Sequence, residues 1–407
     1  YYIINSSQPS KTLYTNYKAK KKLMSSILIQ GWRIHKSGDE YYLNYIQWVY
    51  LKEILKYYDD ICLLSSISII KDNSDQLMEI GTFKNVSVHP LHYEQDFTYI
   101  GAIKHFPKFF RTYKSLRKFD VTYARYPSPF SWLQKVFMNK SKRIIHFVGS
   151  PVDTLLKNPN IFIFKKIFLA LCFFPEYLMH LWACKGAKIF TNGIHIHNNL
   201  AKFGVKSKPL ISSILTENDF HYDSLKKISN ERPKLLYLGY LRKAKGIDTV
   251  IKSFALLQNK IPEAELTIVG DGETKTKQDL HEIINQNSIK NVHFLGHIDS
   301  RTRLNDIMRN HDIFCFASLS EGSPRVIIES MANGLNIVST PVGSLPHIFF
   351  DDRDIVYFDF NNSKMLYEKV LFLINNSHNA SLMRESAYQK VKKYTAENFN
   401  KELFNNA

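Results

Sequence analysis

The sequence has few cysteines, and none of them belongs to a C-x-x-C pair. Cys62, Cys172, Cys184 and Cys315 are scattered along 407 residues, and no secretory signal precedes them. This usage excludes a disulfide-rich scaffold and is typical of a reducing compartment. We therefore expect a cytoplasmic protein.

Long apolar runs are also missing. The longest apolar stretch, residues 161–184, contains two lysines, a proline and a glutamate, so it lacks the roughly 20 uninterrupted apolar residues of a spanning helix. We expect that it does not cross a bilayer but can lie on one. Residues 1–10 have no apolar core of signal-peptide type. The first residue is Tyr rather than Met, which suggests that an N-terminal piece is missing, and residues 1–24 are expected to form an extension.

Acidic residues are scarce in the first half of the chain. Residues 1–220 hold 30 Lys and Arg against 15 Asp and Glu, a balance of +15, whereas residues 221–407 hold 24 against 22, a balance of +2. A basic half joined to a neutral half predicts that one domain faces something anionic, such as a phospholipid surface, a pyrophosphate-linked lipid or nucleic acid.

The length and the pattern of the chain predict two α/β domains. At about 150 residues per domain, 407 residues are too many for one core. In the second half, short apolar runs alternate with helical segments, as in a parallel sheet that is covered on both faces. The strands are expected at 235–238, 266–269, 292–295, 313–317 and 337–339.

The first half has a similar but less regular pattern. Strands are expected at 26–30, 61–70, 121–123, 143–148 and 188–191, and helices near 41–57, 104–118 and 164–182. We place an N-terminal Rossmann-like domain at 25–215, a second at 216–385 and a final helix at 386–407 that can cross back to the first domain. Polar residues near 206–233 indicate the boundary between the domains.

Three loops in the second half combine glycines with charged residues after strands, where open α/β sheets bind ligands. They are Gly239-Tyr-Leu-Arg-Lys-Ala-Lys-Gly246, Gly270-Asp-Gly272 and the segment from Ser318 to Gly334. In the third, Ser323 is expected to cap a helix that starts at Pro324 and ends before Gly334. The exposed N–H groups at 323–326 would then form an anion site beside Glu321 and Glu329.

Residues 234–350 resemble the retaining glycosyltransferases of family four, which have the GT-B fold: two Rossmann-like domains facing each other across a cleft. Glu321 and Glu329 match the E-x7-E motif of that family within Glu-Gly-Ser-Pro-Arg-Val-Ile-Ile-Glu-Ser-Met-Ala-Asn-Gly. The segments Lys245-Gly246, 269–272, 294–296 and 341–346 match in the same order. An ordered series of motifs is far more specific than any one of them.

The resemblance implies a role for each matching residue. Glu321 would contact the donor sugar near the reacting carbon, Glu329 would bind the ribose, and Lys245 would hold the pyrophosphate together with the start of the helix. The donor-binding set comprises Glu329, Arg242, Gly322, Ser323, Arg325, Val326, Ile298, Gly270 and Gly38, with Ile298 near the base. Tyr240 and His347 depart from the family pattern, where Arg and Glu are frequent. Arg242 or Lys243 is therefore expected to supply the second cation.

Breaking a sugar–phosphate bond places negative charge on the leaving diphosphate, which cations and a helix dipole can stabilise. We expect no essential metal and no cofactor besides the donor, a UDP- or GDP-sugar. Asp352-Arg353-Asp354 resembles a metal-binding D-x-D, but a solvated acidic turn is the favoured interpretation. His195 and His197 lack a third ligand nearby.

Candidates in the first half remain open between two interpretations. Gly38, in Ser37-Gly38-Asp39, either touches the donor phosphate or belongs to an ordinary turn before a helix. His146 either faces the sugar and acts in catalysis or is a core histidine. Arg125 either meets an acidic acceptor or forms a structural ion pair.

The segment Lys104–Lys118 has aromatic residues at helical spacing and a basic face. It is either a helix that lies in a lipid headgroup layer or a domain helix with its aromatics in the core.

The function expected from these observations is retaining transfer of a sugar from a nucleoside diphosphate sugar to a polysaccharide or lipid-linked oligosaccharide. The enzyme is expected to sit peripherally on the inner face of the plasma membrane, on an anionic surface. A nucleotide-sugar epimerase or an inverting transferase is the alternative. A nucleic-acid-binding protein is disfavoured, because no recognition motif accompanies the basic residues.

Overall fold

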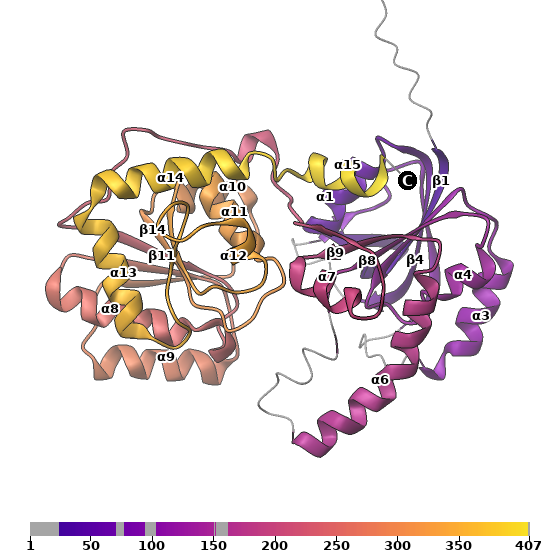
Figure 1. The fold of residues 1–407 in the computed structure, drawn as a ribbon, viewed down its shortest axis with the longest axis horizontal. Helices are drawn as coiled ribbons and strands as arrows, with labels where there is room; N and C mark the ends of the chain where they lie inside the picture. The colour runs from indigo at the N-terminus through magenta and orange to yellow at the C-terminus, as the bar shows by residue number, and fades with distance from the viewer. Residues whose placement is uncertain (1–23, 71–76, 94–102, 150, 152–161, 406–407) are drawn as a thin grey trace, which may run out of the picture.

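A computed structural model describes residues 24–70, 77–93, 103–149, 151 and 162–405. These residues form two α/β domains that stand side by side, each built on its own sheet (Figure 1). The strand candidates of both halves of the sequence are strands in the structure.

The N-terminal domain is built on the larger sheet. Its strands are β1 (Met24–Gln30), β2 (Ile34–Ser37), β3 (Glu40–Asn44), β4 (Tyr58–Ile69), β5 (Leu77–Glu79), β6 (Val86–Tyr93), β7 (Val121–Tyr126), β8 (Lys142–Phe147), β9 (Lys188–Asn192) and β10 (Lys208–Leu210). Their order is β10-β9-β8-β7-β1-β4-β2-β3-β5, and β6 pairs with β4. Pairing is parallel except that β3 runs antiparallel to β2 and β5.

The helices of this domain are α1 (Tyr45–Ile54), α3 (Phe106–Ser115), α4 (Leu133–Phe137), α6 (Ile163–Ala183) and α7 (Ile194–Ala201). The helix expected at 41–57 was wrong at its start, because residues 40–44 form strand β3. Asn44 then caps α1 by accepting a hydrogen bond from the backbone N–H of Gln47 at 2.9 Å. A side chain that satisfies this N–H favours the switch from strand to helix at Asn44.

The C-terminal domain has a parallel sheet of β11 (Lys234–Leu238), β12 (Glu265–Val269), β13 (Val292–Gly296), β14 (Ile313–Phe316), β15 (Asn336–Ser339) and β16 (Val356–Tyr357). The order is β13-β12-β11-β14-β15-β16. The accompanying helices are α8 (Ile247–Lys260), α9 (Thr274–Gln286), α10 (Arg301–Arg309), α11 (Arg325–Ala332), α12 (Leu345–Ile348), α13 (Ser363–Asn375) and α14 (Ser377–Val391).

Two apolar layers cover this sheet, one on each face. Phe254 of α8 packs in one of them and Phe314 of β14 in the other, and both side chains are fully buried. Burial on both faces explains why these strands are continuous apolar runs rather than alternating ones.

The last helix, α15 (Ala396–Phe404), returns to the N-terminal domain, where it lies against α1 (Figure 1). Phe399, Leu403 and Phe404 join the core of that domain, while the preceding α14 packs on α11 of the C-terminal domain. The chain therefore links the two domains twice, once before β11 and once between α14 and α15.

Helix α3 uses its aromatic residues in the core. Phe109 and Tyr113 are fully buried, and Phe110 is 42% exposed. For residues 104–118 the structure therefore favours the domain helix over the helix in a headgroup layer, because Phe109 and Tyr113 are covered by protein.

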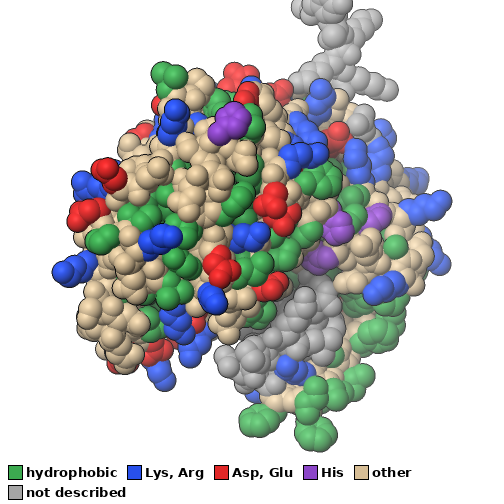
Figure 2. All heavy atoms as spheres, turned by 60° about the vertical axis from the view of Figure 1, so that its left-hand side comes forward, with side chains coloured by type: hydrophobic (Ala, Val, Ile, Leu, Met, Phe, Trp, Pro, Cys, Tyr) green, Lys and Arg blue, Asp and Glu red, His purple; other side chains and the backbone are tan. Residues whose placement is uncertain are grey.

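Helix α6 is different, because most of its apolar side chains are exposed. Phe164 and Phe168 are 83% and 65% exposed, and an 18-residue window of the helix is only 11% buried. By length and composition α6 is the one helix among the described residues that could cross a membrane, which differs from the sequence-based expectation. Figure 2 shows apolar side chains projecting at the lower end of the molecule, where α6 begins in Figure 1.

Candidate functional site

Each sheet has a point where the strand order reverses, and there the loops after two neighbouring strands diverge. In the C-terminal sheet the reversal lies between β11 and β14, and in the N-terminal sheet it lies between β1 and β7. Ligands of open α/β sheets bind in such crevices. The loops at 239–246 and 317–324 belong to the first reversal, and those at 31–33 and 127–131 to the second.

A cavity of about 610 Å³ lies between the two domains and is lined by loops from both reversal points. Gly31 and Arg125 line it from the N-terminal domain, and Glu321, Ser323 and Arg325 line it from the C-terminal domain. Gly31 has φ +97°, and a Cβ atom there would stand 2.5 Å from the carbonyl oxygen of Arg125. Only glycine lets the loop after β1 approach the backbone of β7 so closely.

Lys245 and Glu321 form an ion pair at the reversal point of the C-terminal sheet. Lys245 ends a short 3₁₀ turn, Lys243–Lys245, after β11, and Glu321 lies in the loop after β14. Ser318 Oγ donates a second hydrogen bond to the same Glu321 oxygen at 2.8 Å. The backbone N–H of Leu319 donates to the carbonyl of Ala244 at 2.9 Å, which joins the two loops.

Helix α11 begins one residue later than the sequence suggested. Pro324, with an extended backbone, occupies the cap position, and no side chain caps the first turn. The expectation that Ser323 caps this helix is wrong, because its oxygen forms no capping bond. The first turn therefore leaves backbone N–H groups for a ligand, as expected of an anion site at a helix start.

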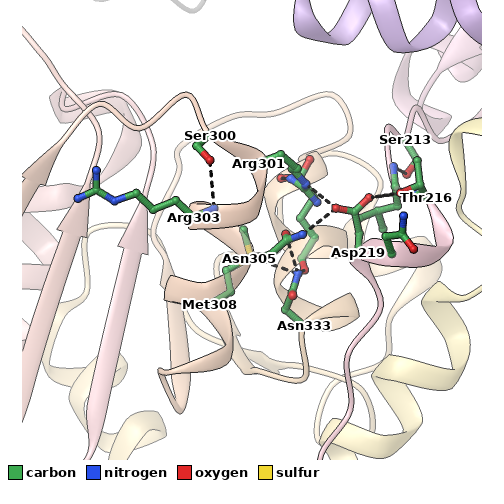
Figure 3. Close-up of polar contacts among 12 residues, drawn as sticks. Ser213, Thr216, Asp219, Ser300, Arg301, Arg303, Asn305, Met308 and Asn333 are labelled. Carbon is green, nitrogen blue, oxygen red and sulfur yellow. Dashed lines mark hydrogen bonds and ion pairs between the residues drawn. The ribbon is translucent and has the colours of Figure 1, made fainter.

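Glu329 of α11 is held by an ion pair that sequence reasoning missed. Arg301 Nη1 donates to Glu329 Oε2 at 2.8 Å, and Arg301 Nε donates to Asp219 Oδ1 at 2.9 Å. Asn305 Nδ2 also donates to Asp219, at 2.8 Å, and its Oδ1 accepts from Asn333 Nδ2 at 3.2 Å (Figure 3). The network joins α10, α11 and the 3₁₀ turn Glu217–Asp219.

The electrostatics of this network favour the charged forms of Asp219 and Arg301. Burial alone would raise the pKa of Asp219, but the Arg301 guanidinium and the hydrogen bonds to the carboxylate outweigh it, so the pKa is lowered. Burial likewise opposes the charge of Arg301, yet Glu329 and Asp219 raise the pKa of the guanidinium. No local signal could have revealed this, since Asp219 lies 82 residues before Arg301 and 110 before Glu329.

Several donor-binding candidates lie outside the lining of the interdomain cavity. Arg242 is exposed beside the Lys243–Lys245 turn, and Val326 is partly buried on α11. Ile298 is 93% buried, with its side chain packed against Phe314 and its neighbours, so it offers a base little more than its backbone. Gly270 has φ +137° and touches the loop after β11.

Gly38 lies elsewhere. It forms the turn of the β2–β3 hairpin with φ +57°, and it does not line the cavity. The expectation of a turn that leads from a strand into a helix was wrong, because a second strand follows. It is Gly31, directly after β1, that lines the cavity.

His146 lies at the cavity, at the end of β8, and is 98% buried. Its Nδ1 shares a hydrogen bond of 2.8 Å with the hydroxyl of Tyr123, whereas its buried Nε2 has no hydrogen-bond partner among the residues that the structure describes. Burial, assisted by the nearby Arg125, lowers the pKa of His146 to about 3. The ring is therefore neutral at physiological pH and has one nitrogen available to a ligand.

No group of three potential metal ligands exists among the described residues. Asp352 has an exposed side chain, but Asp354 is buried and accepts bonds of 2.6 Å from Ser386 and Lys390 of α14. The interpretation of 351–354 as a solvated turn is therefore wrong for Asp354, which holds α14 against the sheet. His197 shares a hydrogen bond of 2.9 Å with Ser207.

Comparison with known proteins agrees with the geometry of the second half. Residues 222–390 match the family model described as glycosyl transferases group 1. The C-terminal half of the chain is therefore similar to the glycosyl transferases of group 1. The matched residues include the Lys245–Glu321 pair, Arg301 and Glu329, whereas Asp219 lies just before them.

Individual relatives extend the likeness toward the N-terminal domain. Protein CapJ of Staphylococcus aureus is 29% identical over 235 residues, 56% of this chain and 57% of that protein. The N-acetylgalactosamine-N,N'-diacetylbacillosaminyl-diphospho-undecaprenol 4-alpha-N-acetylgalactosaminyltransferase of Campylobacter jejuni is 23% identical over 280 residues, 67% of this chain and 73% of that protein. For three curated relatives the match spans only 33% to 57% of their length.

The fold of the whole chain has solved counterparts. The crystal structure of Anabaena Alr3699/HepE in complex with UDP and glucose matches 93% of this chain and 98% of that chain, with a TM-score of 0.61 at 16% identity. The predicted GT-B fold, two α/β domains facing each other across a cleft, is thereby confirmed.

Proposed function

We propose that this protein transfers a sugar, with retention of configuration, from a nucleoside diphosphate sugar to a polysaccharide or lipid-linked oligosaccharide. The observation that carries the proposal is the Lys245–Glu321 pair. It stands at the reversal point of the C-terminal sheet and beside the start of α11, and its Glu321 lines the interdomain cavity.

The proposed chemistry assigns charge stabilisation to this domain. As the sugar–phosphate bond breaks, Lys245 and the backbone N–H groups of α11 would stabilise the diphosphate, with Arg242 as the second cation. Glu321 would face the sugar near the reacting carbon, and His146 Nε2 would bind a sugar hydroxyl from the opposite domain. Glu329 would bind the ribose with the carboxylate oxygen that Arg301 leaves unused.

A UDP-sugar is the proposed donor, with a GDP-sugar as the variant of the same chemistry. HepE, which shares the fold, has been solved with UDP and glucose. Thermal unfolding in the presence of UDP-, GDP- and ADP-sugars tests the donor, because a ligand at 100 times its Kd stabilises the native state by about 2.7 kcal/mol. Melting temperatures that no nucleotide sugar changes would oppose the proposal.

Variants at the glutamates test the mechanism. Glu321→Gln removes the carboxylate that pairs with Lys245, and Glu329→Ala removes the partner of Arg301. We expect Glu321→Gln to lower kcat by about 100-fold or more, as loss of a charge-stabilising group does. We expect Glu329→Ala to act mainly on the KM for the donor. Turnover of both variants at the parent rate would refute these roles.

The stereochemistry of the product tests retention. NMR of the anomeric proton of the product separates a retaining from an inverting transferase. Release of an isomerised nucleotide sugar without an acceptor would identify an epimerase instead.

A lipid-linked or capsular acceptor is proposed from the relatives. The Campylobacter relative is named for a diphospho-undecaprenol acceptor, and another relative is the capsular polysaccharide biosynthesis glycosyltransferase CapM of Staphylococcus aureus. Such an acceptor places the enzyme at a membrane, and we propose that it binds the anionic inner face peripherally and does not use nucleic acid.

Helix α6 is the proposed contact with that surface. It carries exposed Phe164, Phe168 and Leu171 together with Lys165 and Lys166, a combination suited to an anionic headgroup layer. Flotation with vesicles of anionic phospholipid tests this contact.

The double variant Phe164→Ser/Phe168→Ser should lose most of its vesicle binding, since burying one Phe contributes about 1.5–3 kcal/mol. Leu382→Ser, at a 53% exposed site on α14, is the matched control. Equal flotation of the double variant and the control would exclude α6 as the contact. If the protein instead binds an oligonucleotide, and this binding weakens steeply as the salt concentration rises, the partner is a nucleic acid.

A further inference from the structure

Three arginines line the interdomain cavity, namely Arg33, Arg125 and Arg325, and the last two come from different domains. Arg125 lies near the end of β7 in the N-terminal domain, and Arg325 is the first residue of α11 in the C-terminal domain. Among the residues that the structure describes, neither side chain forms an ion pair. Glu321 is the only acidic residue in the described lining, and Lys245 already binds it. The structural ion pair considered for Arg125 is therefore not found in the described part of the chain.

The two guanidinium groups affect the electrostatics of the same side chain, that of Tyr50. Burial raises the pKa of Tyr50, and both Arg325 and Arg125 oppose the rise electrostatically. Tyr50 lies on α1, and its side chain lines the cavity. Arg125 also lowers the pKa of His146, whose buried Nε2 has no hydrogen-bond partner within the described part of the chain. Cations from two domains thus converge near Tyr50, beside an unsatisfied polar atom.

Like charges that converge in a partly enclosed space repel each other, and an anion between them would remove the repulsion. Guanidinium groups bind carboxylates and phosphates through paired N–H donors. Ser128 supplies a hydroxyl group in the same lining, whereas the hydroxyl of Ser65 already donates to the backbone carbonyl of Trp32. The cavity therefore has the chemistry of an oxyanion site.

The C-terminal wall of this site overlaps the start of α11, which is expected to hold the donor diphosphate, because Gly322, Ser323 and Arg325 line the cavity. The N-terminal wall is separate from the donor groups. Lys245 and Arg242 do not line the cavity, and most of the lining belongs to the N-terminal domain. A ligand bound by the N-terminal lining would face Glu321 and the start of α11 across the cavity. That is the position of the second substrate.

We propose that Arg125, with the side chain of Arg325, binds an oxyanion of the acceptor, a phosphate ester or a sugar carboxylate, close to the hydroxyl that receives the sugar. This proposal rests on the proposed glycosyl transfer and narrows its acceptor to anionic molecules. Neutral glycans would lack the group that fills the space between the two arginines.

Calorimetric titration of the full chain tests the site, with sodium pyrophosphate and sodium glucuronate as separate probes. Saturating UDP is present, so that the donor diphosphate site is already filled. We expect at least one probe to bind, with a Kd that rises with salt. Arg125→Gln should raise that Kd by about 10- to 100-fold, the loss expected for a charged hydrogen bond.

Arg125→Lys keeps the charge but not the paired donors, and it should lie between the parent and Arg125→Gln. Arg111→Gln, at an exposed position of α3 outside the cavity, is the matched control and should bind like the parent. Circular dichroism of each variant verifies the fold. If Arg125→Gln is unfolded, the Arg125→Lys titration decides.

The outcomes separate the two proposals. Failure to bind UDP contradicts the glycosyl transfer, and the Arg125 dependence of oxyanion binding is then measured without UDP. Pyrophosphate binding alone indicates a phosphorylated acceptor, and glucuronate binding alone an acidic sugar. The oxyanion site is refuted if neither probe binds the UDP-loaded protein, or if Arg125→Gln binds both as tightly as the parent.

Discussion

Replacing Arg301 by Met should destabilise the C-terminal domain by about 3 kcal/mol. The Arg301 side chain is 13% exposed and bonds carboxylates that are 6% and 13% exposed, those of Asp219 and Glu329. Removing one partner from a buried ionic group costs about 3–5 kcal/mol, because uncompensated charge stays buried. We expect the lower end, since Asp219 keeps its bonds from Asn305 and from the backbone N–H of Thr216.

The assay is urea unfolding followed in parallel by far-ultraviolet circular dichroism and by tryptophan fluorescence. All four tryptophans lie in residues 1–215, so fluorescence follows the N-terminal domain, whereas circular dichroism follows both. The Arg301→Met shift should therefore be seen by circular dichroism. Arg303→Met is the matched control, since Arg303 is exposed on the same helix and points away from the network (Figure 3). It should change stability by no more than about 0.5 kcal/mol.

The network should also affect donor binding through Glu329. If Arg301 positions the Glu329 carboxylate for the ribose, Arg301→Met weakens binding of UDP but not of 2′,3′-dideoxy-UDP, which lacks the ribose hydroxyls. A loss below about 1 kcal/mol in stability, together with equal losses for both nucleotides, would refute the reasoning. Adding Glu329→Gln to Arg301→Met should recover part of the stability, because it removes one stranded charge.

Further predictions concern pH, backbone and metal. Burial would raise the pKa of Asp354, but Lys390 and other hydrogen-bond donors lower it to about 2 from 3.8. Its stabilisation is thus present above about pH 4 and lost as pH falls toward 2, and Lys390→Gln should flatten that acid limb in pH-dependent melting. Because His146 is neutral, His146→Gln should lower kcat without removing an inflection between about pH 5 and 8 from the rate profile. Gly270→Ala places Cβ 1.9 Å from the Gly239 carbonyl oxygen and should cost more than about 1 kcal/mol in urea unfolding, whereas neutrality would mean that the loop yields. Dialysis against EDTA should leave transfer activity unchanged, and rescue by a divalent metal would contradict this expectation.

Much of the C-terminal domain could be predicted from local pattern. Apolar strands followed by glycine and polar loops placed β11, β12, β14 and β15 correctly. The spacing of Glu321 and Glu329 placed one carboxylate in a loop and one on a helix. The details of caps were less predictable, because Ser323 and Pro324 both suit a helix start and only the backbone path decides between them.

Local pattern was weaker in the N-terminal domain, where the hairpin of β2 and β3 occupies residues assigned to a turn and a helix. Residues 41–44 can form either state, and pairing with β2 and β5 decides for the strand. The aromatic spacing of α3 and the apolar run of α6 likewise did not tell which helix is covered. Burial of Phe109 and exposure of Phe164 depend on what packs against each helix.

By itself the sequence determined the fold class and the two reversal-point loops of the second domain, because these depend on short-range spacing of apolar residues, glycines and charges. The residues assigned to the diphosphate stay a prediction. Tertiary structure alone decided the partners. It joined Arg301 to Asp219 and Glu329, and it paired Asp354 with Lys390 of α14. It also brought Arg125 and Arg325 from two domains to the lining of one cavity. Those residues are far apart in the chain, and only the packing of helices and loops within the C-terminal domain, or of the two domains against each other, brings them together.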